Sequence, residues 1–174
     1  LMDQAIQAGY QNSFLKLSDL SRILDIRSAT LHRMANRIKE QDIPGSIAEL
    51  GVYRGDIAWQ LNALFPEREL LLFDTFQGFD AKDVKTEKER CFSRAEIQNF
   101  SDTSADYVKS RLPFPKQALF YPGYFPETTC GLPDRQFALV SLDTDLYEPI
   151  LAGLQYFYPR LSSSVMTLLH DYNN

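Results

Sequence analysis

The sequence is poor in features that mark secreted, membrane-spanning or disulfide-rich proteins. Its 174 residues include two cysteines, Cys91 and Cys130, which are isolated and have no metal-type spacing. No apolar run approaches the ~18–20 residues that a membrane-spanning helix needs. The polar opening L-M-D-Q-A-I-Q does not resemble a signal peptide. We therefore expect reduced thiols, a cytoplasmic location and no membrane partner.

Clusters of basic residues are also absent. The net charge is −5 and no basic block interrupts the sequence, which argues against a nucleic-acid or anionic-membrane partner. Apolar residues make up 44% and charged residues 24%, a balance typical of soluble globular proteins. A chain of this length is sufficient for one domain with a sizeable core.

Short apolar runs alternate with helical patterns through most of the chain. The runs predict buried strands at residues 47–50, 69–73, 118–121, 137–142 and 165–169. Helical periodicity lies between them, at residues 57–65, 105–112 and 150–158. This alternation predicts an α/β fold of the Rossmann-like, doubly wound type, in which a mostly parallel sheet has helices on both faces.

Residues 1–42 are predicted to form an N-terminal helical segment, and residues 43–174 the α/β domain. The segment carries two apolar stripes at helical spacing. Their members are Leu17, Leu20, Ile23 and Leu24 in the first, and Leu31, Met34, Ala35 and Ile38 in the second. We expect these helices to pack over one end or face of the sheet.

A glycine turn follows the first predicted strand in the stretch I-A-E-L-G-V-Y-R-G. Gly51 and Gly55 allow close approach of the backbone to a ligand, and the next helix offers its free N–H groups there. Strand, glycine turn and helix together are typical of the start of a nucleotide-binding sheet. The spacing differs from the G-x-G-x-x-G of pyrophosphate binders, and an ordinary tight turn is the alternative interpretation.

Carboxylates stand at the ends of three predicted strands. They are Asp74, Asp143 and Asp171. Because ligands of open α/β sheets bind outside the carboxyl ends of the strands, we expect these acids to converge on one cavity. Asp74 lies roughly 20 residues after the turn, where a carboxylate accepts hydrogen bonds from two ribose hydroxyls. Capping of the next turn is the alternative for each acid.

Residues 80–100 are dense in charge and are too long for a plain connection in an α/β unit, where ~2–6 residues are usual. We predict a mobile, partly helical flap beside the ligand site. A solvated insertion without a role is the alternative. Gly123, Tyr124 and Phe125 follow the third strand, where they suit either an adenine ring or a core turn.

Six motifs in order resemble the macrocin O-methyltransferase family over residues 44–172. They are E-L-G-V-Y-R-G, F-D-T-F-Q-G-F, F-S-D-T-S, P-G-Y-F-P-E-T, L-D-T-D-L-Y-E-P and H-D-Y. The resemblance implies a class I S-adenosylmethionine-dependent enzyme that methylates a sugar hydroxyl with the help of magnesium. The acceptor would be a small molecule or a glycan.

The resemblance also implies roles for particular residues. The cofactor would be held by Glu49, Gly51, Tyr53, Gly55, Asp74, Thr75, Gly123, Tyr124 and Phe125. Asp143, His170 and Asp171 would form the catalytic and metal-binding set, with Asp145 in support. His170 stands where the family has a carboxylate, and it is either an imidazole ligand or the general base.

The chain departs from the family pattern near its end. Ser162, Ser163 and Ser164 replace a Gly-Gly pair, and the family's last two strands would lie beyond Asn174. We therefore expect the native protein to continue. A non-catalytic S-adenosylmethionine- or nucleotide-binding module is an alternative. An NAD-dependent sugar-modifying enzyme is another, although no Y-x-x-x-K pair is present. A homo-oligomer formed through the N-terminal helices stays open.

Overall fold

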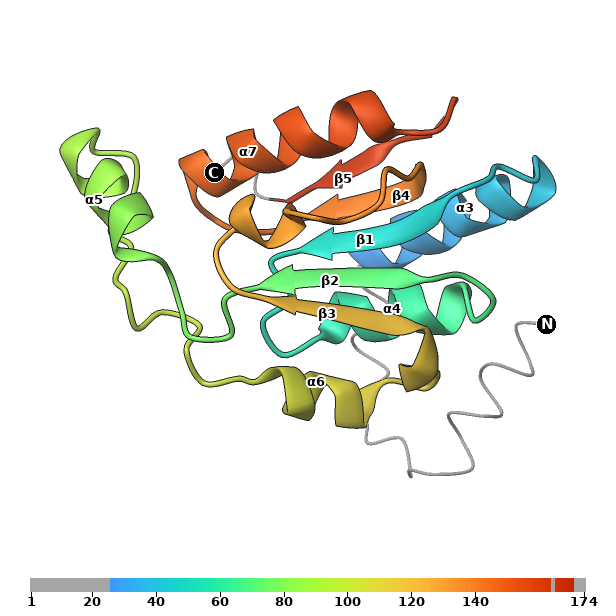
Figure 1. Ribbon diagram of the computed structural model, residues 1–174, viewed down its shortest axis with the longest axis horizontal. Helices are drawn as coiled ribbons and strands as arrows, with labels where there is room; N and C mark the ends of the chain where they lie inside the picture. The colour runs from blue at the N-terminus through green and yellow to red at the C-terminus, as the bar shows by residue number, and fades with distance from the viewer. Residues whose placement is uncertain (1–25, 164, 171–174) are drawn as a thin grey trace.

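The computed structural model describes residues 26–163 and 165–170 (Figure 1). Strands and helices alternate along this part of the chain. The strands are β1 (Ser46–Leu50), β2 (Leu70–Asp74), β3 (Ala118–Pro122), β4 (Phe137–Leu142) and β5 (Thr167–Leu169). The helices are α3 (Ile26–Glu40), α4 (Asp56–Leu64), α5 (Ala81–Glu89), α6 (Ala105–Arg111) and α7 (Tyr147–Phe157).

All neighbouring strands of the described sheet are parallel, and their order is β3-β2-β1-β4-β5. This is the predicted Rossmann-like arrangement. In Figure 1 the arrowheads of the strands point toward the side of the molecule where α5 lies. The carboxyl ends of the strands therefore share one edge.

Alternate side chains of the central strands face two helical layers. Ile47 and Leu139 belong to the core that includes side chains of α3, α4 and α6. Leu50 and Leu142 pack in the second core, against Phe157 of α7. The apolar stripe predicted for α3 is confirmed, because its four apolar side chains are buried in the first core. The stripe predicted between residues 17 and 24 lies outside the described residues.

Two element boundaries differ from the prediction. Helix α7 begins at Tyr147 rather than at residue 150, because Pro149 lies in its first turn, where a missing N–H breaks no helical bond. Strand β5 begins at Thr167 rather than at residue 165, because it pairs only with the last three residues of β4. The other four strands are displaced from their predicted bounds by at most one residue.

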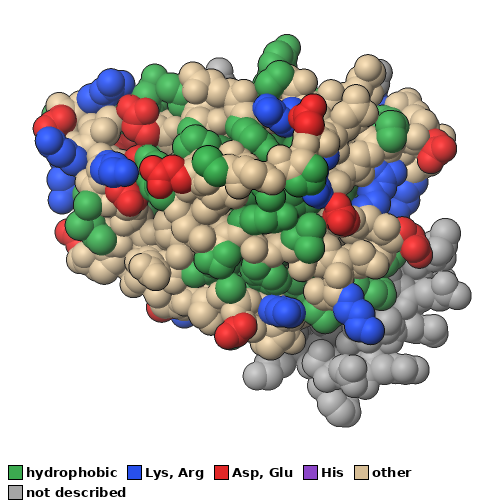
Figure 2. Space-filling model, in the orientation of Figure 1, with side chains coloured by type: hydrophobic (Ala, Val, Ile, Leu, Met, Phe, Trp, Pro, Cys, Tyr) green, Lys and Arg blue, Asp and Glu red, His purple; other side chains and the backbone are tan. Residues whose placement is uncertain are grey.

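The surface and the thiols agree with the composition. Figure 2 shows Lys and Arg side chains interspersed with Asp and Glu side chains at the end of the molecule where α5 lies. Cys91 and Cys130 are both exposed free thiols. Within the described residues, the helices are all too short or too polar to cross a bilayer.

Candidate active site at the carboxyl edge of the sheet

Backbone hydrogen bonds of the sheet continue one step beyond the strand ends. This step places the residues that follow neighbouring strands side by side. The bonds run from Gly51 N to Phe73 O (3.0 Å), from Asp143 N to Leu50 O (2.8 Å), and from His170 N to Leu142 O (3.0 Å). The glycine turn, the strand-four acid and the strand-five histidine therefore form one row at the carboxyl edge.

Three potential metal ligands meet in this row. One ligand atom each from Asp143, Asp145 and His170 lies within 4.8 Å of the other two. Nδ1 of His170 lies 2.8 Å from Oδ1 of Asp143. Ligands of one magnesium ion, each ~2.1 Å from the metal, are about 3–4 Å apart, so a small closure of this cluster fits the ion. Asp171, predicted as a ligand, lies outside the described residues.

Arg27, in the first turn of α3, also reaches this cluster. Its Nη1 lies 2.8 Å from Nε2 of His170. Nothing in the local sequence around Arg27 indicated this contact, because the two residues are far apart in the chain and meet only when α3 packs on the sheet.

Glu49 places a third carboxyl group beneath the row. Its side chain is buried in β1, with 1% of its surface exposed. Burial raises the pKa of Glu49 well above its usual range, and the charges of Asp143, Asp74 and Asp56 raise it further. Among the described residues, Oε2 of Glu49 has no hydrogen-bond partner. A cationic ligand above it, such as a sulfonium or an ammonium group, would offset this concentration of acid.

The two glycines of the turn are required by the protein's own packing. Gly51 has φ +89°, and a Cβ there would overlap the carbonyl oxygen of Asp143. Gly55 has φ +78°, and a Cβ there would lie 2.6 Å from Cγ1 of Val108. Gly51 thus packs the turn against the residue that follows β4, and Gly55 packs the start of α4 against α6. Contact of this turn with a cofactor stays a prediction.

The carboxylate of Asp74 caps both the glycine turn and the turn that follows β2. Oδ2 accepts hydrogen bonds from the N–H groups of Val52 (2.6 Å) and Tyr53 (2.9 Å), and Oδ1 accepts one from Phe76 N (2.6 Å). The capping alternative is therefore realised. Each oxygen has two acceptor sites, so one site, on Oδ1, remains for a ribose hydroxyl, and the predicted ribose contact stays a prediction.

Tyr53 is held by the segment that follows the insertion. Its backbone is left-handed (φ +47°), and its hydroxyl donates to Oδ1 of Asp102 (2.9 Å), a bond that raises the pKa of Tyr53. Thr103 Oγ1 donates to the carbonyl of Tyr53 (2.5 Å). Thr75, by contrast, donates within its own turn, to the carbonyl of Gly78 (2.5 Å).

The residues predicted to border an adenine ring are engaged in protein contacts. Phe125 is buried, with its ring centroid 5.5 Å from that of Phe73 and 5.7 Å from that of Phe157. Tyr124 donates its hydroxyl to Oδ1 of Asp83 (2.8 Å). Gly123 continues the sheet by donating its N–H to the carbonyl of Asp74 (2.9 Å). Their adenine role stays a prediction.

The insertion at residues 80–100 is partly helical, as predicted, and α5 is docked through two buried carboxylates. Asp83 and Glu87 are 5% and 3% exposed. Oε1 of Glu87 accepts a hydrogen bond from the N–H of Tyr147 (2.8 Å) and so caps the N-terminus of α7. The N-cap residue of α7, Leu146, supplies no side-chain acceptor of its own. Burial raises the pKa of Asp83. The insertion thus covers the start of α7, immediately after the loop that carries Asp145.

We expect Glu87→Ala to release this insertion. Loss of the cap leaves the Tyr147 N–H unsatisfied, at a cost of about 1–3 kcal/mol, which raises the open population roughly 5- to 150-fold. Trypsin cleavage after Lys88, Arg90 and Arg94 should accelerate accordingly, because proteolysis of an open state follows its population. Glu89→Ala on the same helix removes an exposed carboxylate and is the control. Equal cleavage rates in the two variants would show that Glu87 does not hold the insertion.

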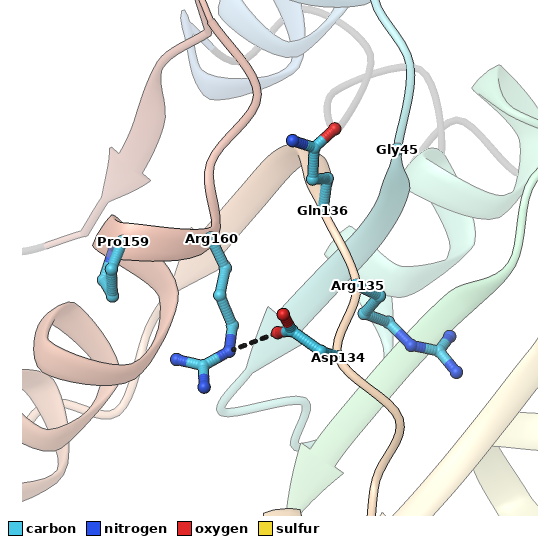
Figure 3. Close-up of a pocket in the computed structure, with 6 residues that line it drawn as sticks. All are labelled: Gly45, Asp134, Arg135, Gln136, Pro159 and Arg160. Atoms are coloured by element: carbon cyan, nitrogen blue, oxygen red, sulfur yellow. Dashed lines mark ion pairs between the residues drawn. The ribbon is translucent and has the colours of Figure 1, made fainter.

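A pocket of about 390 Å³ lies at the other edge of the sheet (Figure 3). Gly45 and Gln136 line it just before β1 and β4, and the ion pair between Asp134 Oδ1 and Arg160 Nε (3.4 Å) spans it. It is therefore at the amino ends of these strands, away from the row of acids. The carboxyl edge, where Asp143, Asp145 and His170 meet, is the candidate site. Convergence of Asp74 and Asp171 on the same cavity stays a prediction.

Comparison with known proteins supplies the family context. A sequence profile of the family described as Macrocin-O-methyltransferase (TylF) matches residues 19–174. The chain is 27% identical over 141 residues to the 8-demethyl-8-(2,3-dimethoxy-alpha-L-rhamnosyl)-tetracenomycin-C 4'-O-methyltransferase of Streptomyces olivaceus. It is 25% identical over 141 residues to the demethyldecarbamoylnovobiocin O-methyltransferase of Streptomyces niveus. Each match covers 75% of this chain and 54% of the relative, so the chain spans about half the length of these relatives.

Two solved structures share the fold. The O-methyltransferase NovP superposes with a TM-score of 0.67 at 24% identity, over 84% of this chain and 64% of NovP. CalS11, a calicheamicin methyltransferase, superposes with a TM-score of 0.66 at 23% identity, over 99% of this chain and 77% of CalS11. Both comparisons agree with a Rossmann-like class I arrangement of the sheet.

Proposed function

Since this chain belongs to the macrocin O-methyltransferase family, we propose that it is the core of an S-adenosylmethionine-dependent, metal-assisted O-methyltransferase acting on a sugar hydroxyl. The observation that carries the proposal is the row at the carboxyl edge. There a glycine turn, a buried acid and three potential metal ligands, Asp143, Asp145 and His170, occupy adjacent strand ends. Methyl donor, cation and acceptor hydroxyl need to meet at such a point.

The chemistry divides between the bound groups and the protein. S-adenosylmethionine supplies an electrophilic methyl group, and a divalent cation makes a hydroxyl a better nucleophile by lowering its pKa. Asp143 and Asp145 would hold the cation through carboxylate oxygens, the ligands that magnesium prefers. The turn at residues 51–55, which hydrogen bonds to Asp74 hold in place, would position the methyl donor. Glu49 would lie beneath the methyl donor.

The insertion has a role in this scheme. Methyl transfer needs the acceptor oxygen held in line with the methyl group, and water kept from the site. Helix α5 lies over the start of α7, beside the loop of Asp145. We propose that residues 80–100 open to admit the acceptor and close over it, as the flap prediction requires.

The relatives and the thiols support proposals for the acceptor and the compartment. One relative's name specifies a rhamnosyl-tetracenomycin and another's demethyldecarbamoylnovobiocin. We propose a sugar hydroxyl of a natural product or glycan as the acceptor for this chain. The two exposed free thiols fit the proposed cytoplasmic location.

Thermal unfolding of the intact protein with S-adenosylhomocysteine or NAD tests the cofactor. A ligand at a hundred times its Kd stabilises by about 2.7 kcal/mol, which raises Tm by roughly 5–10 °C for a protein of this size. We expect that shift with S-adenosylhomocysteine and none with NAD at the same concentration. A larger shift with NAD would contradict the proposal. A shift with S-adenosylhomocysteine but no methyl transfer to any glycoside would favour a non-catalytic module.

A further inference from the structure

His170 lies between a donor and an acceptor. On one side, Nη1 of Arg27 lies 2.8 Å from Nε2. On the other, Nδ1 lies 2.8 Å from Oδ1 of Asp143. The second contact has the distance of an ion pair but not the alignment of a hydrogen bond, so a small rotation of the carboxylate is needed for straight donation. The ring thus bridges α3 and the end of β4.

These two neighbours specify where the imidazole proton lies. A guanidinium group has five N–H donors and no acceptor, so the Nε2 that faces Arg27 must present its lone pair. A neutral imidazole then carries its proton on Nδ1. That nitrogen faces a carboxylate oxygen, which accepts. Donor and acceptor therefore select the same tautomer from opposite sides of the ring.

This tautomer bears on the role of His170. A metal ligand or a general base must aim a free lone pair at the reacting groups. The nitrogen on the side of Asp143 carries a proton instead, and the only lone pair is directed at Arg27.

We propose that Arg27 is a positioning residue. It holds His170 in the Nδ1–H form, so that His170 orients Asp143 by donating to it and serves neither as a metal ligand nor as the base. The cation site would then consist of oxygen ligands alone. Such a site favours magnesium or manganese, whereas an imidazole ligand would favour zinc. This last step rests on the proposed metal function, while the tautomer does not.

Nitrogen-15 NMR of histidine-labelled intact protein tests the tautomer without metal or cofactor. Two-bond proton–nitrogen correlations distinguish Nδ1–H from Nε2–H, and a His170→Asn variant identifies the signals of His170. His32 is an internal control, because its Nδ1 lies 2.8 Å from the carbonyl oxygen of Ser28 and Arg27 does not enter that contact. We expect the Nδ1–H form for His170 in the wild type.

Matched variants of α3 complete the test. Arg27→Ala should shift His170 in part toward Nε2–H, because only the poorly aligned contact with Asp143 then favours Nδ1–H. Arg27→Lys should retain more of the Nδ1–H form than Arg27→Ala, and Arg33→Ala, which removes an exposed charge from the same helix, should leave the tautomer unchanged. Zinc affinity relative to manganese should rise about tenfold in Arg27→Ala, because the Nε2–H form directs the Nδ1 lone pair at the cation site and an imidazole ligand favours zinc. The proposal would be overturned if His170 of the wild type were in the Nε2–H form. It would also be overturned if the tautomer populations of His170 were the same in the wild type and in Arg27→Ala. A protein that binds no divalent cation, yet shows the expected tautomers, would contradict the metal function alone.

Discussion

Methyl transfer by the intact protein should stop in the presence of a chelator and return when magnesium or manganese is added. Asp143 and Asp145 place carboxylate oxygens close enough to share one ion, and a sugar hydroxyl is a poor nucleophile without such help. Metal assistance is worth several kcal/mol in the transition state, so its loss should lower kcat about 10²- to 10⁴-fold. Turnover measured after chelation and after metal return gives the comparison.

Substitution of the two acids should reproduce the effect of the chelator. We expect an Asp143→Asn/Asp145→Asn double variant to lose activity to the same extent and to bind manganese weakly by calorimetry. Asp134→Asn changes an exposed carboxylate at the opposite edge of the sheet and is the control. Full turnover in chelator, or in the double variant, would exclude the metal mechanism.

Asp74→Ala should lower the stability of the protein strongly. The substitution removes a carboxylate that accepts three backbone N–H bonds, two of them from the glycine turn. Hydrogen bonds to charged groups contribute about 1.5–3 kcal/mol each and are not fully additive, so we expect a loss of about 3–5 kcal/mol. Urea unfolding measures it.

The same variant separates the two roles of Asp74. If the carboxylate also binds the ribose, S-adenosylhomocysteine affinity should fall about 10- to 100-fold, the equivalent of one charge-assisted hydrogen bond. Calorimetry on the folded fraction checks this, with Glu67→Ala, an exposed acid in the turn before β2, as the control. Reduced stability with unchanged affinity would show that Asp74 serves only the turn.

The sheet and the row of site residues were predictable because both depend on local patterns. Apolar runs such as F-A-L-V-S-L identify strands wherever they occur, and parallel strands bring their carboxyl ends together. The adjacency of Asp143 and His170 follows from those two facts. The start of α7 was predicted at residue 150, after Pro149, although a proline in the first turn is compatible with a helix, and α7 begins at Tyr147.

The contacts that join distant segments were not predictable. Asp83 and Glu87 lie on a helix whose composition indicates solvent exposure, yet both are buried. Their partners, Tyr124 and Tyr147, are separated from them by some 40 to 60 residues. Arg27 and His170 are likewise far apart in the sequence. A single sequence contains no local signal for such pairs, because they arise from the packing of one element on another.

Any side chain at position 51 would overlap the carbonyl oxygen of Asp143. The glycine turn and the loop that carries Asp143 and Asp145 are therefore in direct contact, and we expect exchange of either segment alone between homologous enzymes to disturb this contact. A chimaera that takes residues 143–146 from a relative should also take residues 51–55 from it. Libraries for directed evolution of acceptor range will retain more folded members if these two segments are varied together and Gly51 is kept.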